Sequence, residues 1–441
     1  MAKKSKRVIA LAFDGLPYSL ASRFTSDGLM RSLAALLAEG EMVRMESVLP
    51  PVSSVAWASF QTGSNPGKSG IFGFAELTCD FDLRVATSED LQARTIWEIA
   101  SDGGKRVISL GVPMTFPPRP IHGIMVSDFL TPSLEKGVWP PSALPKISEF
   151  GYVLDIDPVQ ARESLDYLKR EALKALNARA NTVLSLCERE DWDLFFAHFI
   201  ETDRVNHFLW KYFDEGDPVN HRYFLDFYAR VDEVIAEVKR RINLDEVALI
   251  ILSDHGFCRT QHEVEMNFWL EHEGYLEYSA SSRPGWKTIH HRSKAVALVP
   301  GRIHILREGI WESGSVTESE YEGVCESLLS KLKNLRDPET GNKICKRVLT
   351  RNEAFKGPCV GPDIIIDPHD GYDLKAAHGK DSLFSTSPIS GMHTFHDAML
   401  YISRHHFEHT TPALIDVMPT ILEMLGLPPP PGIDGHSLAG H

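Results

Sequence analysis

Three apolar runs that end directly before acidic residues decide the fold of this chain: VIALAF at residues 8–13, LFFAHF at residues 194–199 and VALIIL at residues 247–252. Continuous runs of Val, Ile, Leu and Phe, without polar alternation, are typical of strands that are buried on both faces of a parallel sheet. Further runs of this kind occupy residues 107–112, 364–366 and 399–402.

Helical patterns alternate with these strands. In residues 161–190 apolar side chains recur every three or four positions, which predicts a long amphipathic helix. Shorter patterns of the same kind cover residues 29–38, 224–242 and 415–425. Strand–helix alternation predicts an α/β fold with a doubly wound, mostly parallel sheet that is flanked by helices.

Two stretches break this alternation, an irregular one rich in proline at about residues 130–157 and a longer one at about residues 267–354. Residues 286–306 have the composition of a β-rich piece, residues 318–335 have a helical pattern, and core-like strands resume at Ile364. We therefore predict an inserted cap region at residues 267–354. The α/β core then comprises residues 1–266 and 355–441.

Composition excludes several classes of function. The 441 residues include 46 Lys and Arg against 60 Asp and Glu, a formal net charge of −14, which argues against a nucleic-acid or anionic-membrane surface. The chain has six cysteines, and none is in a C-x-x-C pair. Its basic start lacks the pattern of a signal peptide. No run approaches the ~18 apolar residues that a membrane helix needs. These features predict a cytoplasmic protein with reduced thiols; its oligomeric state stays open.

The acidic residues after the three strands are the first functional signal. Asp14 follows the first run, Asp203 lies four residues beyond the second, and Asp254 follows the third. Because the carboxyl ends of parallel strands form the ligand crevice of such a sheet, we expect these carboxylates to converge. Like charges that crowd together repel, and a bound cation relieves that repulsion.

Histidines accompany two of these acids. Asp203 and His207 are four residues apart, which places both on one face of a helix, and His255 is adjacent to Asp254. With one further histidine the donors suffice for two cations. This mixture of imidazole and carboxylate fits Zn²⁺, or Mn²⁺ as the alternative, whereas Mg²⁺ and Ca²⁺ sites need only oxygen.

Ser53 and Ser54 form the third signal. They lie in residues 49–74, a segment rich in hydroxyls, glycine and proline, and they precede the pattern of a short helix within it. The N-terminus of a helix favours a bound anion. A serine beside a cation has a lowered hydroxyl pKa and becomes a nucleophile. The alternative is that one of these serines only caps the helix.

Together these motifs resemble the alkaline phosphatase superfamily over nearly the whole chain, and within it the type I phosphodiesterase/nucleotide pyrophosphatase group and its microbial phosphohydrolase relatives. The resemblance implies an alkaline phosphatase-like fold. It rests on FDGL at residues 13–16, the block at 50–74, DRVNH at 203–207, SDHGF at 253–257, GMHTFHD at 391–397 and the ending at 415–435.

The resemblance also implies roles for single residues. The family's nucleophile lies nine residues before the Thr of its TG pair, which selects Ser53 and leaves Ser54 in reserve. His396 and His378 are alternatives for the late histidine of the second ion. The implied ligands are Asp14, Ser53, Asp254 and His255 for the first ion, and Asp203, His207 and His393 for the second.

The chain departs from the family pattern at two places. Ala56, followed by Trp57, stands where the diesterases carry an Asn that binds a phosphoryl oxygen, and Ser69 replaces the His of an HGI motif. The C-x-P-x-R or S-x-P-x-R motif of sulfatases is absent around Ser53, which argues against a sulfatase.

The predicted function is a two-metal phosphohydrolase that cleaves phosphate esters of small substrates through a phosphoenzyme intermediate on Ser53. A metal-dependent phosphomutase or a phosphomonoesterase is the alternative, and a metal-binding protein without activity is a third hypothesis. A monoesterase needs extra cationic groups, for which Lys68, Arg204 and Lys294 are candidates.

Overall fold

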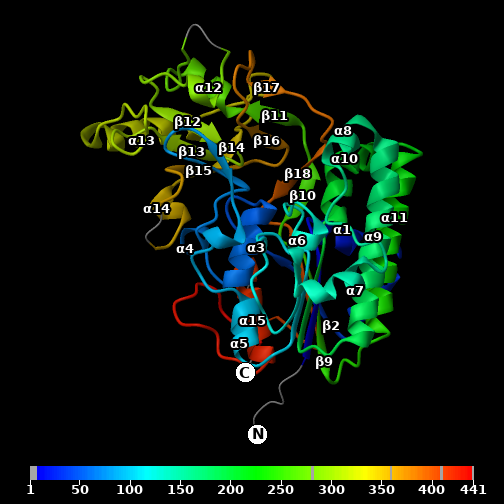
Figure 1. The fold of residues 1–441 in the computed structure, drawn as a ribbon. Coiled ribbons are helices and arrows are strands. Elements are labelled where there is room, and N and C mark those ends of the chain that lie inside the picture. The colour runs from blue at the N-terminus through cyan, green and yellow to red at the C-terminus, as the bar shows by residue number, and fades with distance from the viewer. Residues whose placement is uncertain (1–6, 280–282, 358–359, 408–410, 440–441) are drawn as a thin grey trace. The chain divides into compact units, whose positions relative to one another are not determined.

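A computed structural model describes residues 7–279, 283–357, 360–407 and 411–439, so that the basic start at residues 1–6 lies outside the described part. The chain forms two compact units, which Figure 1 shows as a ribbon. Unit 1 comprises Met1–Asn65, Thr87–Cys258 and Ile389–His441, and unit 2 comprises Pro66–Ala86 and Arg259–Pro388. The predicted cap, residues 267–354, lies within the second segment of unit 2, which extends beyond it on both sides.

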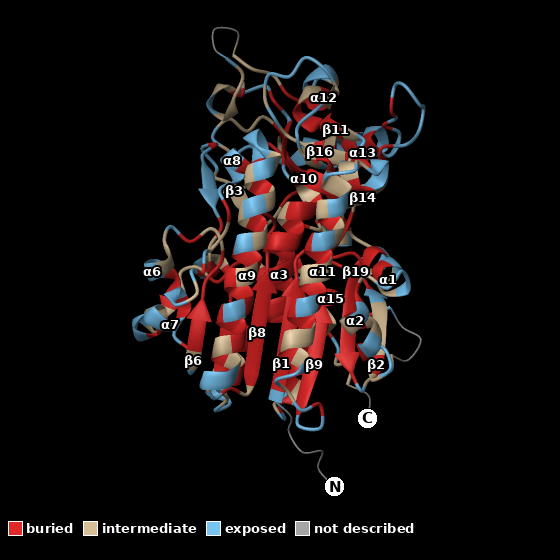
Figure 2. Ribbon diagram, turned by 90° about the vertical axis from the view of Figure 1, so that its right-hand side faces the viewer, coloured by how far each residue is buried: buried red, intermediate tan, exposed pale blue. Residues whose placement is uncertain are grey.

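Unit 1 is built on an eight-stranded sheet with the order β2-β19-β9-β1-β8-β5-β6-β7. Strands β9, β1, β8, β5 and β6 are parallel neighbours, which confirms the predicted mostly parallel α/β fold. Figure 2 shows β8, β1 and β9 side by side and buried along most of their length. The strands are β1 Arg7–Phe13, β2 Gly40–Met45, β5 Val107–Leu110, β6 Gly123–Val126, β7 Val138–Trp139, β8 Leu194–Phe199, β9 Val247–Leu252 and β19 Ala398–Ser403.

One predicted strand runs against the expected direction. The run at residues 399–402 forms β19, which pairs antiparallel with both β9 and β2. The reason is local. The chain enters β19 directly from β18 (Gly391–Thr394), which pairs with β10 (Gly256–Arg259) just beyond the carboxyl end of β9, so β19 must run back along the sheet.

Helices cover both faces of this sheet. Residues Ile9, Leu11 and Phe13 of β1 belong to the apolar core that includes α9, α10 and α11, whereas α3 and α15 pack together and α15 contacts β1. The helices of unit 1 are α1 Tyr18–Ser26, α2 Arg31–Leu36, α3 Ser53–Thr62, α5 Ile96–Asp102, α6 Leu134–Gly137, α7 Leu144–Ser148, α8 Pro158–Glu163, α9 Leu165–Arg189, α10 Glu201–Glu215, α11 Asn220–Lys239 and α15 Leu414–Met424.

Unit 2 has its own apolar core and its own sheets. The predicted strand at residues 364–366 is present as β15, but it pairs in the order β12-β13-β15-β14 of this unit and not in the main sheet. An apolar run indicates burial and does not identify the partner strand. The other elements are α4 Pro66–Ser69, β3 Ala75–Leu77, β4 Leu83–Val85, β11 His262–Glu265, α12 Met266–His272, β12 Ala295–Leu298, β13 Arg302–Ile305, α13 Glu318–Lys333, β14 Cys345–Thr350, α14 Arg351–Ala354, β15 Ile364–Pro368, β16 Tyr372–Lys375 and β17 Phe384–Ser385.

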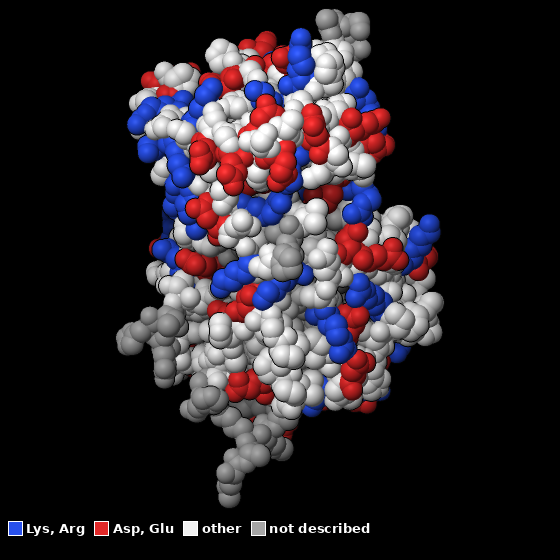
Figure 3. Space-filling model, turned by 90° about the vertical axis from the view of Figure 1, so that its left-hand side faces the viewer, with Lys and Arg blue, Asp and Glu red and all other residues white. Residues whose placement is uncertain are grey.

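Charged side chains of both signs lie on the surface. On the face drawn in Figure 3, the described Lys and Arg side chains are interspersed with Asp and Glu. In the part of the chain that the structure describes, no helix is long and apolar enough to cross a membrane.

A buried ion pair joins α9 to the first residue of α10. Arg179 Nε donates to Glu201 Oε1 at 2.9 Å, with side-chain exposures of 2% and 1%. We expect Arg179→Ala to lower the free energy of unfolding by about 3–5 kcal/mol, because it leaves the Glu201 carboxylate buried and unpaired.

Urea denaturation measures this loss, and α9 also offers a matched control. Arg189 pairs with Glu149, but their side chains are 61% and 42% exposed. We expect Arg189→Ala to cost less than about 1 kcal/mol. Equal losses in the two variants would contradict the stabilising role of the buried pair.

Candidate active site

The strand ends of the main sheet bring the three predicted carboxylates together. Asp14 follows β1, Asp203 lies in the first turn of α10 after β8, and Asp254 follows β9 by two residues. Because β9, β1 and β8 are neighbours, all three side chains lie at one edge of the sheet. Asp14 and Asp254 are fully buried, and Asp203 is 2% exposed.

A glycine after Asp14 permits this close approach. Gly15 has a φ of +63°, a backbone conformation that residues with a Cβ atom rarely adopt. Its N–H donates to Asp254 Oδ1 at 3.1 Å. A Cβ at this position would lie 2.8 Å from the ring of Phe257. The glycine of the FDG motif therefore allows the ends of β1 and β9 to lie in contact.

The first donor group consists of Asp14, Asp254 and His255, whose ligand atoms lie within 4.8 Å of one another. Asp254 Oδ2 is buried without a hydrogen-bond partner and lies 3.3 Å from His255 Nε2. Burial, followed by the charges of Asp14 and Asp203, raises the pKa of Asp254 well above its usual value. An orphaned carboxylate oxygen among other carboxylates fits a bound cation.

The second donor group consists of Asp203, His255 and His393. His393 Nε2 lies 3.1 Å from Asp203 Oδ1 and 3.0 Å from His207 Nε2. Burial alone would raise the pKa of Asp203, but His207 and His393 hold it well below its usual range. His255 contributes to both groups and joins them into one centre.

The histidines present their Nε2 atoms to the carboxylates. Nδ1 lies 2.8–3.0 Å from a backbone carbonyl oxygen in His207, His255 and His393, and a carbonyl only accepts, so Nδ1 carries the proton. Each Nε2 is then the ring nitrogen that can offer its lone pair to a metal ion. The Nε2 atoms of His207 and His393 lie 3.0 Å apart, and an Nδ1–H held by a backbone carbonyl is the usual arrangement of metal-binding imidazoles.

The ring of His255 is neutral over most of the pH range. Burial, followed by the charge of His393, lowers its pKa to about 3. A neutral imidazole is the form that binds a metal ion.

Ser53 lies beside the first donor group. Its Oγ is 3.3 Å from Asp14 Oδ1 and 3.4 Å from His255 Nε2. The N-cap of α3 is Val52, with no side-chain cap, and Ser53 is the first helical residue, so the capping alternative does not apply to Ser53. Ser54 is fully buried, and its Oγ has no hydrogen-bond partner.

The two alternative late histidines lie in other surroundings. His396 is 42% exposed at its side chain, and its Nδ1 is 3.7 Å from Glu46. His378 lies in unit 2, where its Nδ1 is hydrogen-bonded to Tyr278 at 2.7 Å. The geometry therefore brings His393 to the other donors.

Three further residues contact these carboxylates: the sequence assigned no role to Trp57 and His198, and it offered Arg204 only as a candidate cationic group for a monoester. Trp57 Nε1 and His198 Nε2 contact Asp14 Oδ2 at 3.0 and 2.7 Å, and Arg204 donates to Asp203 Oδ2 at 2.7 Å. The sequence could have indicated the role of His198, because a histidine inside a buried apolar strand requires a polar partner. Burial alone would raise the pKa of Asp14, but the hydrogen bond and charge of His198 lower it.

The fold and these donors define an enzyme class, the metal-dependent phosphoric ester hydrolases. Residues 8–396 match the sequence profile of the type I phosphodiesterase / nucleotide pyrophosphatase family, and the chain belongs to that family. This confirms the resemblance to the alkaline phosphatase superfamily. Among curated proteins none matches this sequence.

Solved structures share the fold at low sequence identity. Phosphonoacetate hydrolase from Sinorhizobium meliloti 1021, in complex with phosphonoformate, is 17% identical with a TM-score of 0.64; the match covers 95% of this chain and 96% of that chain. Murine ectonucleotide pyrophosphatase / phosphodiesterase 5 is 14% identical with a TM-score of 0.57, and 98% of each chain is covered. The human protein of that name is 13% identical with a TM-score of 0.56, covering 98% of this chain and 97% of that chain.

Proposed function

We propose that this chain is a two-metal phosphohydrolase that cleaves phosphate esters through a phosphoenzyme intermediate on Ser53. One observation carries the proposal. Two overlapping groups of carboxylate oxygens and imidazole Nε2 atoms lie beside the hydroxyl of Ser53. The carboxylates are anions and the Nε2 atoms face them with their lone pairs, so this arrangement fits cations bound between them.

The donor chemistry supports two ions and indicates their kind. Asp14, Ser53, Asp254 and His255 would hold the first ion, and Asp203, His207 and His393 the second. Nitrogen and oxygen donors in this proportion favour Zn²⁺, with Mn²⁺ as the alternative. When bound, the ions would neutralise the carboxylates, lower the pKa of the serine hydroxyl and stabilise charge on the phosphoryl oxygens.

The residues of the chain supply the covalent chemistry. Asp14 Oδ1 accepts a hydrogen bond from the Ser53 hydroxyl and orients it. Ser53 Oγ then loses its proton and forms a bond to phosphorus while the bond from phosphorus to the leaving-group oxygen breaks, and the leaving-group oxygen takes up one proton in exchange. Water next attacks the phosphoserine, the bond from phosphorus to Oγ breaks, and a proton returns to the serine. The dipole of α3 places partial positive charge at the Ser53 end.

Arg204 favours a diester over a monoester substrate. A monoester carries one more negative charge and needs an additional cationic group. Arg204 is already engaged, since it donates to Asp203 and contacts both carboxylate oxygens of Asp155 at 2.6–3.2 Å.

Small phosphorus compounds are the substrate class that the structural neighbours support. Phosphonoacetate hydrolase was solved with phosphonoacetate, and an inactive form of the murine pyrophosphatase / phosphodiesterase with AMP. The net charge of −14 supports a small substrate over a nucleic acid. We place the protein in the cytoplasm because its cysteine pattern is not that of a disulfide scaffold.

Metal analysis and an ester panel test the proposed function. We expect about two ions per chain, and faster turnover of bis-(p-nitrophenyl) phosphate than of p-nitrophenyl phosphate, with p-nitrophenyl phosphonate esters as a third substrate. Active enzyme with one ion or none would contradict the two-metal mechanism. Isomerised phosphate esters without free phosphate would instead indicate a phosphomutase, and bound metal without turnover of any ester would indicate a binding protein.

A further inference from the structure

The two oxygens of the Asp14 carboxylate have different surroundings. Oδ1 lies near Ser53 Oγ at 3.3 Å and His255 Nε2 at 3.4 Å. Oδ2 accepts a hydrogen bond from the indole of Trp57 at 3.0 Å and contacts His198 Nε2 at 2.7 Å. One oxygen therefore faces the donor groups, and the other is held by two nitrogen donors.

The two rings behind Asp14 are fixed by packing. Trp57 and His198 are fully buried, and their rings meet edge to face at 5.1 Å and 79°. Trp57 also packs edge to face against Phe60 and Phe196. Because Phe196 and His198 are two residues apart on β8, both side chains lie on the same face of the sheet. Both N–H groups therefore have little freedom to turn away from Oδ2.

Among the described residues, the side chain of His198 is hydrogen-bonded only to Asp14. A carboxylate only accepts, so Nε2 carries the proton in this contact, and the buried Nδ1 has no hydrogen-bond partner. A buried ring nitrogen without a partner is costly. The chain tolerates this cost at His198, where the other ring nitrogen, Nε2, contacts the candidate metal ligand Asp14.

We propose that Trp57 and His198 are positioning residues, which hold Asp14 Oδ2 so that Oδ1 alone is presented to the first metal ion and to Ser53. This inference rests on the proposed function, because it takes Asp14 to be a ligand. Neither residue touches the reacting atoms. Both act through the orientation of one carboxylate, as outer-shell partners of metal ligands do.

Three variants test the inference through metal affinity. Trp57→Phe and His198→Phe keep an aromatic ring but remove the N–H donor, and each is expected to weaken Zn²⁺ binding at one of the two sites by about 10–100-fold. His198→Gln retains an amide N–H and is expected to restore most of that affinity. Titration of the holoenzyme with a chromophoric chelator of known Zn²⁺ affinity measures both sites, and kcat should fall while KM changes little.

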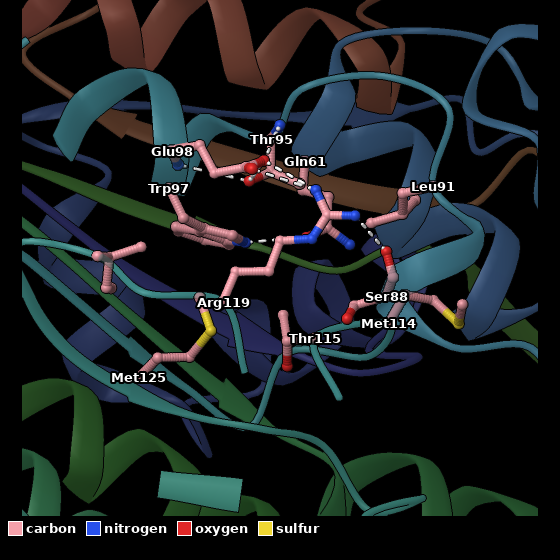
Figure 4. Close-up of a pocket in the computed structure, with 11 residues that line it drawn as sticks. Gln61, Ser88, Leu91, Thr95, Trp97, Glu98, Met114, Thr115, Arg119 and Met125 are labelled. Atoms are coloured by element: carbon pink, nitrogen blue, oxygen red, sulfur yellow. Dashed lines mark hydrogen bonds and ion pairs between the residues drawn. The ribbon is translucent and has the colours of Figure 1, made fainter. Parts of the chain in front are cut away.

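Trp97 provides the matched control. It is a buried tryptophan that packs against the same Phe60 and Phe196 rings, but its Nε1 donates to Gln61 Oε1 at 2.9 Å. Figure 4 shows it among the residues that line a pocket, and this lining includes none of the candidate metal ligands. Trp97→Phe is therefore expected to leave both Zn²⁺ affinities unchanged.

The possible outcomes separate this inference from the proposed function. Wild-type affinity in both Trp57→Phe and His198→Phe, with one ion lost in Asp14→Ala, would overturn the positioning role alone. Two tightly bound ions in Asp14→Ala would overturn the ligand assignment on which the proposed function depends. An equal loss in Trp97→Phe, or no recovery in His198→Gln, would assign the effect to ring packing and also overturn the inference.

Discussion

Ser53→Ala is expected to lower kcat by on the order of 10⁴-fold or more while both metal ions stay bound. The hydroxyl lies beside Asp14 and His255, and its removal leaves no oxygen to attack phosphorus. Asp14, Asp254 and His255 remain to hold the first ion. Steady-state kinetics on a diester, together with elemental analysis of the same preparation, measures both effects.

Ser54→Ala is the matched control for this prediction. Ser54 is the next residue of α3, it is fully buried, and its hydroxyl has no hydrogen-bond partner. We expect Ser54→Ala to keep wild-type turnover. An acid quench of the wild-type enzyme during turnover should trap phosphate on Ser53.

Two results would contradict the assignment of the nucleophile. An active Ser53→Ala enzyme with an inactive Ser54→Ala enzyme would move the nucleophile by one residue. Normal turnover in both variants would exclude a phosphoserine and indicate direct attack by water.

His393→Ala is expected to remove one of the two ions and to lower kcat by more than the roughly 10–100-fold that outer-shell substitutions cost. The reason is that His393 Nε2 lies 3.1 Å from Asp203 and 3.0 Å from His207, so it completes the second donor group. Asp203→Ala and His207→Ala should likewise remove one ion and leave the fold intact.

His396 is the natural control, because it lies three residues away and its side chain is 42% exposed. We expect His396→Ala to keep two ions and wild-type kcat, with metal content measured by elemental analysis after gel filtration. Loss of an ion in His396→Ala, with two ions retained in His393→Ala, would transfer the late ligand to His396.

The departures from expectation share one physical cause. An apolar run such as residues 364–366 or 399–402 shows that a strand is buried, but not which strand it pairs with. β15 belongs to the sheet of unit 2, and β19 runs antiparallel in the main sheet. Pairing depends on how the chain returns to the sheet, which local composition does not record.

The sequence by itself determined the α/β class and the approach of Asp14, Asp203 and Asp254, because parallel strands must end at one edge of their sheet. Helical spacing likewise placed His207 beside Asp203. The family resemblance selected His393 and left His396 and His378 as alternatives, and the tertiary structure decided that His393 lies against Asp203, from which it is 190 residues distant. Only the tertiary structure decided that Trp57 and His198 converge on one oxygen of Asp14. Such contacts arise from the packing of α3, β8 and β18 around the ends of β1 and β9, and no local pattern of residues encodes them.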